Sequence, residues 1–169
     1  MAAIDLDARF DARALRNALG RFATGIAVVM ARDEEGLIGV TVNSFSSVSL
    51  DPPLVLFSMA RTLHTLDRLE KAAAYSVNIL LDTQQEISNR FARYAPDQFA
   101  SVFWEEGVTG APCLTPVHAR FECLPYAHYD GGDHVIFVGR VVHLHAEGEG
   151  NPLLYYGGKY RLLAINEPG

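Results

Sequence analysis

Two long alternating segments joined by a glycine pair constrain the fold of this chain more than any other feature. They read VHARFECLPYAHY (117–129) and HVIFVGRVVHLHA (134–146), and DGGD lies between them. Alternation of apolar and polar residues is typical of strands, and Gly131 and Gly132 favour a tight reversal of the chain. The sequence therefore predicts a long antiparallel hairpin in its C-terminal half.

Shorter apolar runs predict four further strands. RDEEG separates the first two runs and, with Gly36 at its end, indicates a second hairpin. The strands are connected by hairpins rather than by strand–helix–strand crossovers, and no GxGxxG follows the first strand, which argues against a doubly wound fold. We therefore expect a mainly β fold, an antiparallel β-barrel with peripheral α-helices. The four runs are GIAVVMA (25–31), GLIGVTV (36–42), LVLFSM (54–59) and YSVNILL (75–81).

Three segments have helical spacing or helix-capping signals. In the first, Leu15 and Leu19 lie four residues apart and Gly20 follows. In the second segment, leucines recur at helical spacing after a threonine, and the third segment opens with a capping-box pattern. The expected helices are Asp11 to Leu19, the segment with Leu63, Leu66 and Leu69 behind Thr62 as N-cap, and 83–94, which Thr83 and Glu86 open.

The length and net charge of the chain limit the classes of protein to which it can belong. With 169 residues, we expect one domain over 1–169, with 1–10 as a flexible N-terminal segment. The net charge of -6 lacks the basic footprint of a nucleic-acid binder. The N-terminus has no basic and apolar leader pattern, and no apolar run is long enough for a membrane span. These features indicate a cytoplasmic protein with a small-molecule or protein partner.

The two cysteines, Cys113 and Cys123, do not form a CxxC motif. In a reducing compartment they are expected to be small buried side chains. A disulfide between them stays open as an alternative.

The stretch TVNSFSSVSLDPP (41–53) crowds small polar side chains beside an apolar run. Neither face of an extended chain is apolar beyond Val42, and prolines cannot donate to a strand ladder. We expect the regular strand to end at Val42 and the chain then to display hydroxyls, an amide and backbone N–H groups. Two interpretations stay open, a ligand-binding edge and a serine-rich loop that caps itself, with Ser46, Ser47 and Ser49 capping the turn.

The segment FSMARTLHTLDRL (57–69) passes from a strand to an expected helix start. A helix N-terminus offers unpaired N–H groups and a positive dipole, and Arg61 adds a charge that suits phosphate. Next to the polar strand end, this combination favours a planar ligand that carries phosphate.

Other candidate residues are weaker. His134 opens a strand, and Tyr156 in NPLLYYGGKY could present a flat wall to a ring system. Four histidines are conceivable as a metal site, but no carboxylate or cysteine completes the ligand set, so no metal is predicted. No GxSxG or ordered triad points to nucleophilic catalysis. The histidines are His143 and His145, with His118 or His128 opposite.

Five separated motifs together resemble the short-chain flavin reductase family, the small reductase components of two-component flavin-dependent monooxygenases. The resemblance runs from about Phe22 to Leu162. It implies an FMN-binding split β-barrel of Greek-key type, usually a homodimer, that binds FMN or FAD and uses NADH or NADPH. The motifs are GVTVNSFSSVSLDPPLVLFSMARTLHT, YSVNIL, QQEISNRFA, GGDHVIFVGRV and PLLYYGGKY.

The resemblance also implies roles for individual residues. The TVNS segment would line the isoalloxazine, the segment 58–64 would hold the ribityl phosphate, and two residues of NRFA would add flavin contacts. His134 would position the nicotinamide, with Tyr156 on the same side. The implied cofactor-binding residues are Thr41, Val42, Asn43, Ser44, Ser58, Met59, Ala60, Arg61, Thr62, Leu63, His64, Phe91 and Ala92.

The implied chemistry is hydride transfer from nicotinamide to flavin, in which the protein supplies orientation and local electrostatics. It needs no strong general base, which agrees with a sequence that shows no paired carboxylates or triad. Reduced flavin would then leave for a partner monooxygenase. Two other functions stay open, a flavin-containing reductase of a cobalamin, iron or quinone acceptor, and a non-catalytic flavin-binding electron carrier.

Overall fold

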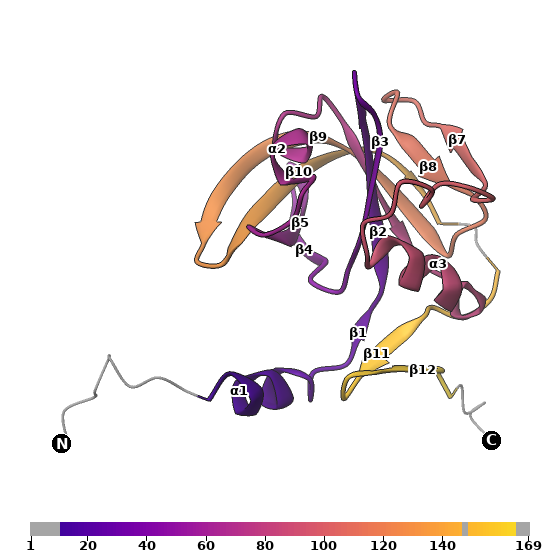
Figure 1. The fold of residues 1–169 in the computed structure, drawn as a ribbon. Helices are drawn as coiled ribbons and strands as arrows, with labels where there is room; N and C mark the ends of the chain where they lie inside the picture. The colour runs from indigo at the N-terminus through magenta and orange to yellow at the C-terminus, as the bar shows by residue number, and fades with distance from the viewer. Residues whose placement is uncertain (1–10, 147–148, 165–169) are drawn as a thin grey trace.

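Seven strands form one antiparallel sheet in the order β3-β2-β6-β9-β10-β5-β4 (Figure 1). The computed structural model describes residues 11–146 and 149–164, so the expected flexible segment 1–10 lies outside the described residues. The mainly β, antiparallel fold predicted from the sequence is confirmed. The strands are β2 (Ala27–Asp33), β3 (Gly36–Val42), β4 (Ser46–Leu50), β5 (Pro53–Ala60), β6 (Tyr75–Ile79), β9 (Ala119–Gly131) and β10 (His134–His145).

The two edge strands of this sheet, β3 and β4, are consecutive in the chain. Within the described residues they make no ladder with each other, so the sheet stays open along one side. Only residues 43–45 connect them. An open side between two edge strands is the arrangement expected of a split barrel.

The long hairpin predicted from the alternating segments is confirmed as β9 and β10. Gly131 pairs with His134, and Gly132 and Asp133 form the turn. Gly132 has a φ of 76°, a left-handed conformation that glycine adopts without steric penalty. β5 pairs with the other side of β10, which sets Ala60 opposite His134.

Two small sheets and one edge strand were not predicted from the sequence. β4 lacks apolar alternation because most of its residues are exposed at the sheet edge, so its pattern does not distinguish it from a loop. The small sheets join strands of two or three residues. They contain β1 (Thr24–Gly25), β11 (Leu154–Tyr156) and β12 (Lys159–Arg161) in one, and β7 (Trp104–Glu106) and β8 (Pro112–Leu114) in the other.

The first predicted helix is confirmed as α1 (Ala12–Leu19), whose N-cap Asp11 accepts hydrogen bonds from two backbone N–H groups. The predicted N-cap Thr62 is wrong, because the chain first makes a turn in which Leu63 N–H donates to the Ala60 carbonyl at 3.0 Å. The second helix, α2 (Leu66–Glu70), begins only after Thr65.

The third helix is shorter than predicted and opens differently. A 3-10 turn over Asp82–Gln84 precedes α3 (Gln85–Phe91), so the predicted Thr83–Glu86 capping box is wrong. The Gln84 side chain instead accepts a hydrogen bond from Leu81 N–H at 2.8 Å. Within residues 11–146 and 149–164, no helix is long and apolar enough to span a membrane.

β2 is buried on both faces and separates two hydrophobic clusters. Val29 belongs to one cluster and Met30 to the other, as alternation along a strand requires. In the larger cluster Phe57 stacks on Phe137 and meets Tyr75 edge-on, with ring centroids 5.2 Å apart in both pairs. We call the seven-stranded sheet with these two clusters the body.

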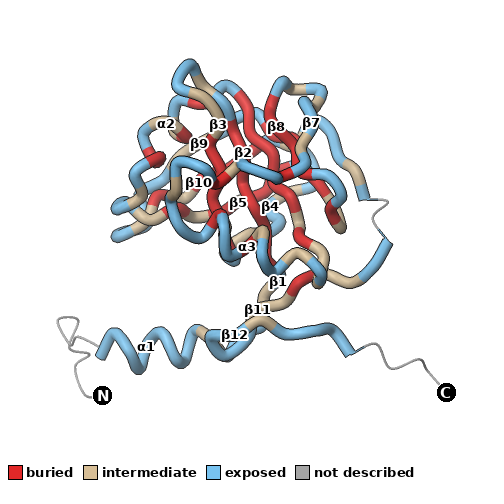
Figure 2. The backbone as a smooth tube through the Cα atoms, turned by 45° about the vertical axis from the view of Figure 1, so that its right-hand side comes forward, coloured by how far each residue is buried: buried red, intermediate tan, exposed pale blue. Residues whose placement is uncertain are grey.

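α1, β1, β11 and β12 lie below the seven-stranded sheet in the view of Figure 1, and we call them the arm (Figures 1 and 2). α1 has no buried residue, and Figure 2 shows it exposed along its whole length. Within the arm, Gly157 N–H donates to the Gly20 carbonyl at 2.8 Å. In the arm, α1 therefore leaves its apolar side chains in solvent, whereas Tyr155 and Tyr160 of β11 and β12 pack against the second cluster of the body.

Candidate functional site

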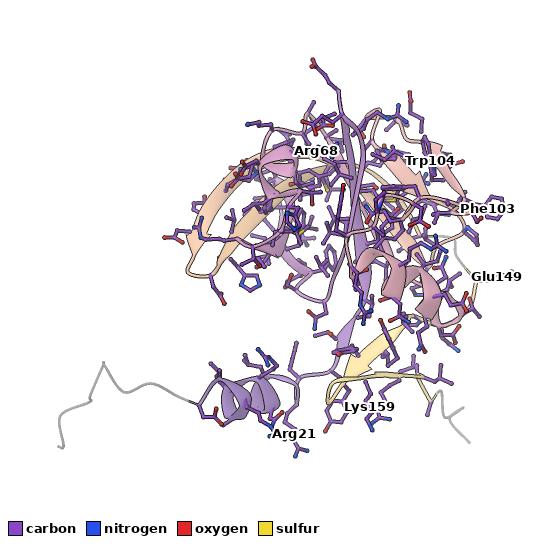
Figure 3. The ribbon with its side chains drawn as sticks, in the orientation of Figure 1. Arg21, Arg68, Phe103, Trp104, Glu149 and Lys159 are labelled. Carbon is purple, nitrogen blue, oxygen red and sulfur yellow. The ribbon has the colours of Figure 1, made fainter. Side chains whose placement is uncertain are left out.

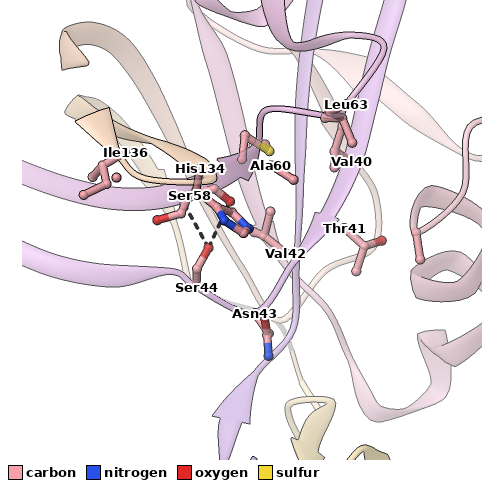
Figure 4. Close-up of a pocket in the computed structure, with 13 residues that line it drawn as sticks. Val40, Thr41, Val42, Asn43, Ser44, Ser58, Ala60, Leu63, His134 and Ile136 are labelled. Atoms are coloured by element: carbon pink, nitrogen blue, oxygen red, sulfur yellow. Dashed lines mark hydrogen bonds between the residues drawn. The ribbon is translucent and has the colours of Figure 1, made fainter. Parts of the chain in front are cut away.

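A cavity of about 480 Å³ lies where the end of β3, the end of β5 and the start of β10 meet (Figure 4). Ten of its thirteen lining residues are among those that the resemblance implied. His134 is the one lining residue with a titratable side chain. The lining residues are Val40, Thr41, Val42, Asn43, Ser44, Ser58, Met59, Ala60, Leu63, Ala92, Gly131, His134 and Ile136.

The polar strand end forms one wall of this cavity. β3 ends at Val42, as predicted, and Asn43 to Phe45 belong to no strand ladder. Their backbone groups are therefore not committed to the sheet. The Thr41 hydroxyl donates to the Ser88 carbonyl at 2.7 Å, which ties β3 to α3.

The hydroxyl of Ser44 ties the segment between β3 and β4 to β5. It accepts a hydrogen bond from Ser58 N–H at 2.9 Å and donates to the Ser58 carbonyl at 3.3 Å (Figure 4). At the following turn, the Ser49 hydroxyl accepts from Asp51 N–H at 3.2 Å. The serine-rich stretch thus caps itself in part and lines the cavity in part.

His134 reaches the cavity from the first residue of β10. Its Nδ1 lies 2.7 Å from a carboxylate oxygen of Asp133. The hydrogen bond from the imidazole holds the pKa of Asp133 below its usual value. Because an ionised carboxylate only accepts hydrogen bonds, Nδ1 is the donor of this bond.

Arg61 clamps the β9–β10 turn to the end of β5. Its Nε donates to the Gly132 carbonyl at 2.8 Å and its Nη2 to Asp130 at 2.7 Å, while its backbone N–H donates to the Asp133 carbonyl at 2.9 Å. The guanidinium holds the pKa of Asp130 below its usual value. Arg61 lines neither this cavity nor the smaller one beside it, so it supports the turn that carries His134.

A smaller cavity of about 130 Å³ adjoins the first, and Val40, Leu63 and Ala92 line both. The smaller cavity holds three further residues that the resemblance implied, Thr62, His64 and Phe91. Its other lining residues are Gly39, Thr65, Tyr94 and Gln98.

Tyr156 does not reach either cavity within its own chain. It ends β11 in the arm and lines a separate hollow of about 430 Å³ with Arg16 and Arg21. Figure 3 shows Arg21 and Lys159 on this arm, below the body. The expected place of Tyr156 beside the nicotinamide stays a prediction.

Several lining residues were missed from the sequence. Val40 and Ile136 are each two residues from a predicted site residue on the same strand, Val42 and His134, so strand alternation could have found them. Gly131 belongs to the predicted turn. Tyr94 carried no signal, because it lies beyond the end of α3 and approaches the cavity only through the tertiary fold.

The cysteines and histidines show no other site within the described residues. Cys113 and Cys123 are free and buried, as predicted. Burial raises the pKa of the Cys113 thiol to about 11 and that of Cys123 to about 12, so both are unreactive at neutral pH. In the part of the chain that the structure describes, no three His, Cys, Asp or Glu side chains cluster to hold a metal.

Comparison with known proteins adds to this geometry. The family described as flavin reductase like domain matches residues 19–164. A probable flavin reductase of Rhizobium meliloti (strain 1021) is 46% identical over 152 residues, which cover 89% of this chain and 49% of that protein. The reductase subunit HsaB of a flavin-dependent monooxygenase from Rhodococcus jostii (strain RHA1) is 38% identical over 150 residues, 89% of this chain and 77% of that protein.

Among solved structures, the NADH:FAD oxidoreductase SgcE6 of Streptomyces globisporus C-1027, in complex with NAD and FAD fragments, superposes with a TM-score of 0.89. It is 34% identical in sequence, and the match covers 99% of this chain and 100% of that one. The present chain spans about half the length of the first curated relative described above.

Proposed function

We propose that this chain, which belongs to the flavin reductase like domain family, is an oxidoreductase that reduces FMN or FAD with NADH or NADPH. The observation that carries the proposal is the cavity of about 480 Å³, because separate motifs of the sequence converge on it. A similar structure named as an NADH:FAD oxidoreductase supports the same reaction.

The lining of the cavity fits a flavin. It contains no Asp, Glu, Lys or Arg side chain, and small or apolar side chains predominate, as a planar ring with polar edges requires. The uncommitted backbone of Asn43 to Phe45 offers hydrogen-bonding groups to such an edge. When bound, flavin would supply the ring that accepts hydride from the reduced nicotinamide.

His134 and its neighbours would act on the nicotinamide side. Asp133 binds Nδ1, so Nε2 is left free to form a hydrogen bond with the carboxamide of a nicotinamide. Arg61 fixes the turn from which His134 projects. These residues would orient the substrate, and orientation is the main contribution of a protein to this chemistry.

The direct test mixes the purified protein with FMN, FAD or riboflavin and follows oxidation of NADH and NADPH by absorbance. We expect oxidation that depends on flavin. No oxidation with either donor and any flavin would contradict the proposal. Oxidation that appears only with a cobalamin, iron or quinone acceptor would favour the alternative reductase, and flavin binding without oxidation would favour an electron carrier.

The role of His134 is tested by His134→Ala, with His143→Ala as control. His143 lies on the same strand, is exposed and lines neither cavity. We expect the His134 variant to raise the KM for NADH or lower kcat while flavin still binds in a titration. Equal kinetics for the two variants would remove the assignment of His134.

We further propose that reduced flavin passes to a partner monooxygenase in the cytoplasm. The monooxygenase reductase subunit HsaB among its relatives supports the partner, and the two free, buried thiols agree with a reducing compartment. A partner oxygenase would be identified by hydroxylation that requires this chain, a flavin and NADH together.

A homodimer would cover apolar side chains that one chain leaves exposed. Such side chains lie on the paired strands β9 and β10 and on the arm, and a two-fold axis lets one patch cover its own copy. We expect sedimentation at the mass of a dimer, and the Leu124→Glu variant should shift it to a monomer. The exposed residues are Leu124, Tyr126, Tyr129, Val142 and Leu144 on the strands, and Leu15, Leu19 and Phe22 near α1.

In such a dimer, Tyr156 of one copy could complete the cavity of the other. Mixed dimers of His134→Ala and Tyr156→Ala chains would then regain part of the activity that each variant lacks. An absence of recovery, with dimers formed, would place Tyr156 outside the site.

A further inference from the structure

One residue of α3 forms hydrogen bonds both with the arm and with a wall of the larger cavity. α3 packs beside β3 and lies directly above β11 in the view of Figure 1. Its residue Ser88 is fully buried. The Ser88 hydroxyl lies 2.9 Å from the phenolic oxygen of Tyr160 on β12, and the Ser88 carbonyl accepts the Thr41 hydroxyl at 2.7 Å. Ser88 therefore connects the arm to the end of β3.

On the arm side, the hydroxyl of Tyr160 holds two consecutive residues of α3. It donates to Oδ1 of Asn89 at 2.8 Å, and because a phenol carries one proton, it accepts the hydrogen bond from the Ser88 hydroxyl. The ring of Tyr160 meets that of Tyr155 edge-on, with centroids 5.5 Å apart, and both rings pack against the second hydrophobic cluster. Tyr160 thus fixes the β11–β12 hairpin to α3.

On the cavity side, the Ser88 carbonyl holds two residues of the wall. It accepts the Thr41 hydroxyl and also the backbone N–H of Ala92, at 3.0 Å. Thr41 and Ala92 both line the larger cavity, the first from β3 and the second from the end of α3. The Thr41 proton points to α3, so the Thr41 oxygen can only accept a hydrogen bond from a ligand, such as the imide N–H of a flavin ring. The position of Ser88 therefore sets both the shape and the hydrogen-bonding character of this wall.

The Tyr160 hydroxyl is what keeps Ser88 in this position. Without it, the Ser88 hydroxyl would be buried with no partner, which costs free energy. The end of α3 would shift to find another partner, and the Ser88 carbonyl would move with it. The two wall residues that the carbonyl holds would then lose their fixed positions.

We propose that Tyr160 is a positioning residue for flavin binding, which acts from the arm through Ser88 on the wall of the larger cavity. The inference rests on the proposed function, because it takes the flavin ring to occupy that cavity. Coupling between two sites is reciprocal, so bound flavin also stabilises the contact of β12 with α3.

The experiment compares Tyr160→Phe with Tyr155→Phe in the full chain. Tyr155 lies opposite Tyr160 in the hairpin and packs against the same cluster, but the two hydrogen bonds to α3 belong to Tyr160. Dissociation constants for FMN and for FAD are measured by calorimetric titration without any nicotinamide. We expect Tyr160→Phe to weaken both flavins about fivefold, as the loss of one hydrogen bond does, and Tyr155→Phe to leave them nearly unchanged.

Two further measurements separate positioning from a general loss of stability. In flavin-free protein, hydrogen exchange at the N–H of Ala92 should be faster in Tyr160→Phe than in Tyr155→Phe, with exchange in the strands of the body unchanged. In a double-mutant cycle, Tyr160→Phe and Thr41→Val should together weaken flavin less than the product of their separate effects, because both act through Ser88.

Three results would overturn the inference. Unchanged dissociation constants in Tyr160→Phe would show that its hydroxyl does not serve the cavity. Equal weakening by the two tyrosine variants would assign the effect to packing of the hairpin, and a fully multiplicative cycle would show that Tyr160 does not act through Ser88. If wild-type protein binds flavin but oxidises neither NADH nor NADPH, the proposed function fails, while the titrations and the exchange rates still test the role of Tyr160.

Discussion

The body and the arm differ in where their apolar side chains lie. In the body, Phe57 and Phe137 are fully buried by strands of the same chain. In the arm, Leu19 and Phe22 are exposed, and α1 buries no residue. The body buries its apolar side chains within the chain, whereas α1 and Phe22 present apolar surface that is free for a second chain to cover. The proposed catalytic cavity lies in the body, and the expected nicotinamide-side Tyr156 lies in the arm.

The largest difference in the free energy of unfolding is expected between two variants that each replace one phenylalanine by alanine, one in the body and one in the arm. Phe57→Ala removes a side chain with 0% exposure and should lower the free energy of unfolding by about 3–5 kcal/mol. Phe22→Ala removes a side chain that is 78% exposed and should change the free energy of unfolding by less than about 0.5 kcal/mol. Urea denaturation at low protein concentration measures both. Equal losses would mean that Phe22 is buried in solution.

A paired glycine substitution tests the same contrast through overpacking. A Cβ at Gly139 would overlap the Tyr75 hydroxyl, whereas a Cβ at Gly25 meets no atom within 4 Å. Gly139→Ala should cost about 1–3 kcal/mol of unfolding free energy, because the buried Tyr75 must shift. Gly25→Ala should leave the denaturation midpoint nearly unchanged. A destabilised Gly25 variant would show that a second copy packs against β1.

The ion pair of Asp33 and Arg68 tests electrostatics within the body. The Arg68 guanidinium donates to Asp33, with Nε 2.7 Å from Oδ2, and it holds the pKa of Asp33 below 3.8 in the folded state. Stability from this pair is therefore present above that pH and is lost as the pH falls through the lowered folded value. Asp33→Asn should lower the free energy of unfolding by about 1 kcal/mol at neutral pH. In this variant the free energy of unfolding should also fall less steeply as the pH is lowered. Denaturation curves at neutral and acid pH measure this difference. The same loss of stability on acidification in the variant and the wild type would contradict the prediction.

The smallest effect on global stability is expected at the N-cap of α1. Asp11→Ala removes two side-chain hydrogen bonds to the first turn and should destabilise the helix by about 1 kcal/mol. Because α1 buries no residue, the unfolding of the body should not change, while circular dichroism should show less helix. A lower midpoint for the body would show that the two regions unfold together.

Features that depend on neighbouring residues could be predicted from the sequence. The strand 36–42 has the predicted bounds, the long hairpin turns where the glycine pair lies, and α1 ends at Leu19 before Gly20, as predicted. Ten of the predicted site residues line one cavity, because the motifs place most of them at or next to the ends of β3 and β5 and the start of β10. The prediction of Thr62 as N-cap failed, since β5 continues to Ala60 and a turn intervenes before α2.

The sequence by itself determined the antiparallel β class, six of the seven strands of the main sheet and the segments that form the cavity, because alternation and turn chemistry act over a few residues. Only the tertiary structure decided that Arg61 pairs with Asp130 rather than facing the cavity. It also brought Tyr94 to a second cavity and placed Tyr156 in the arm. The physical reason is that these placements depend on contacts between segments far apart in the chain, and no local pattern records which strands will pair.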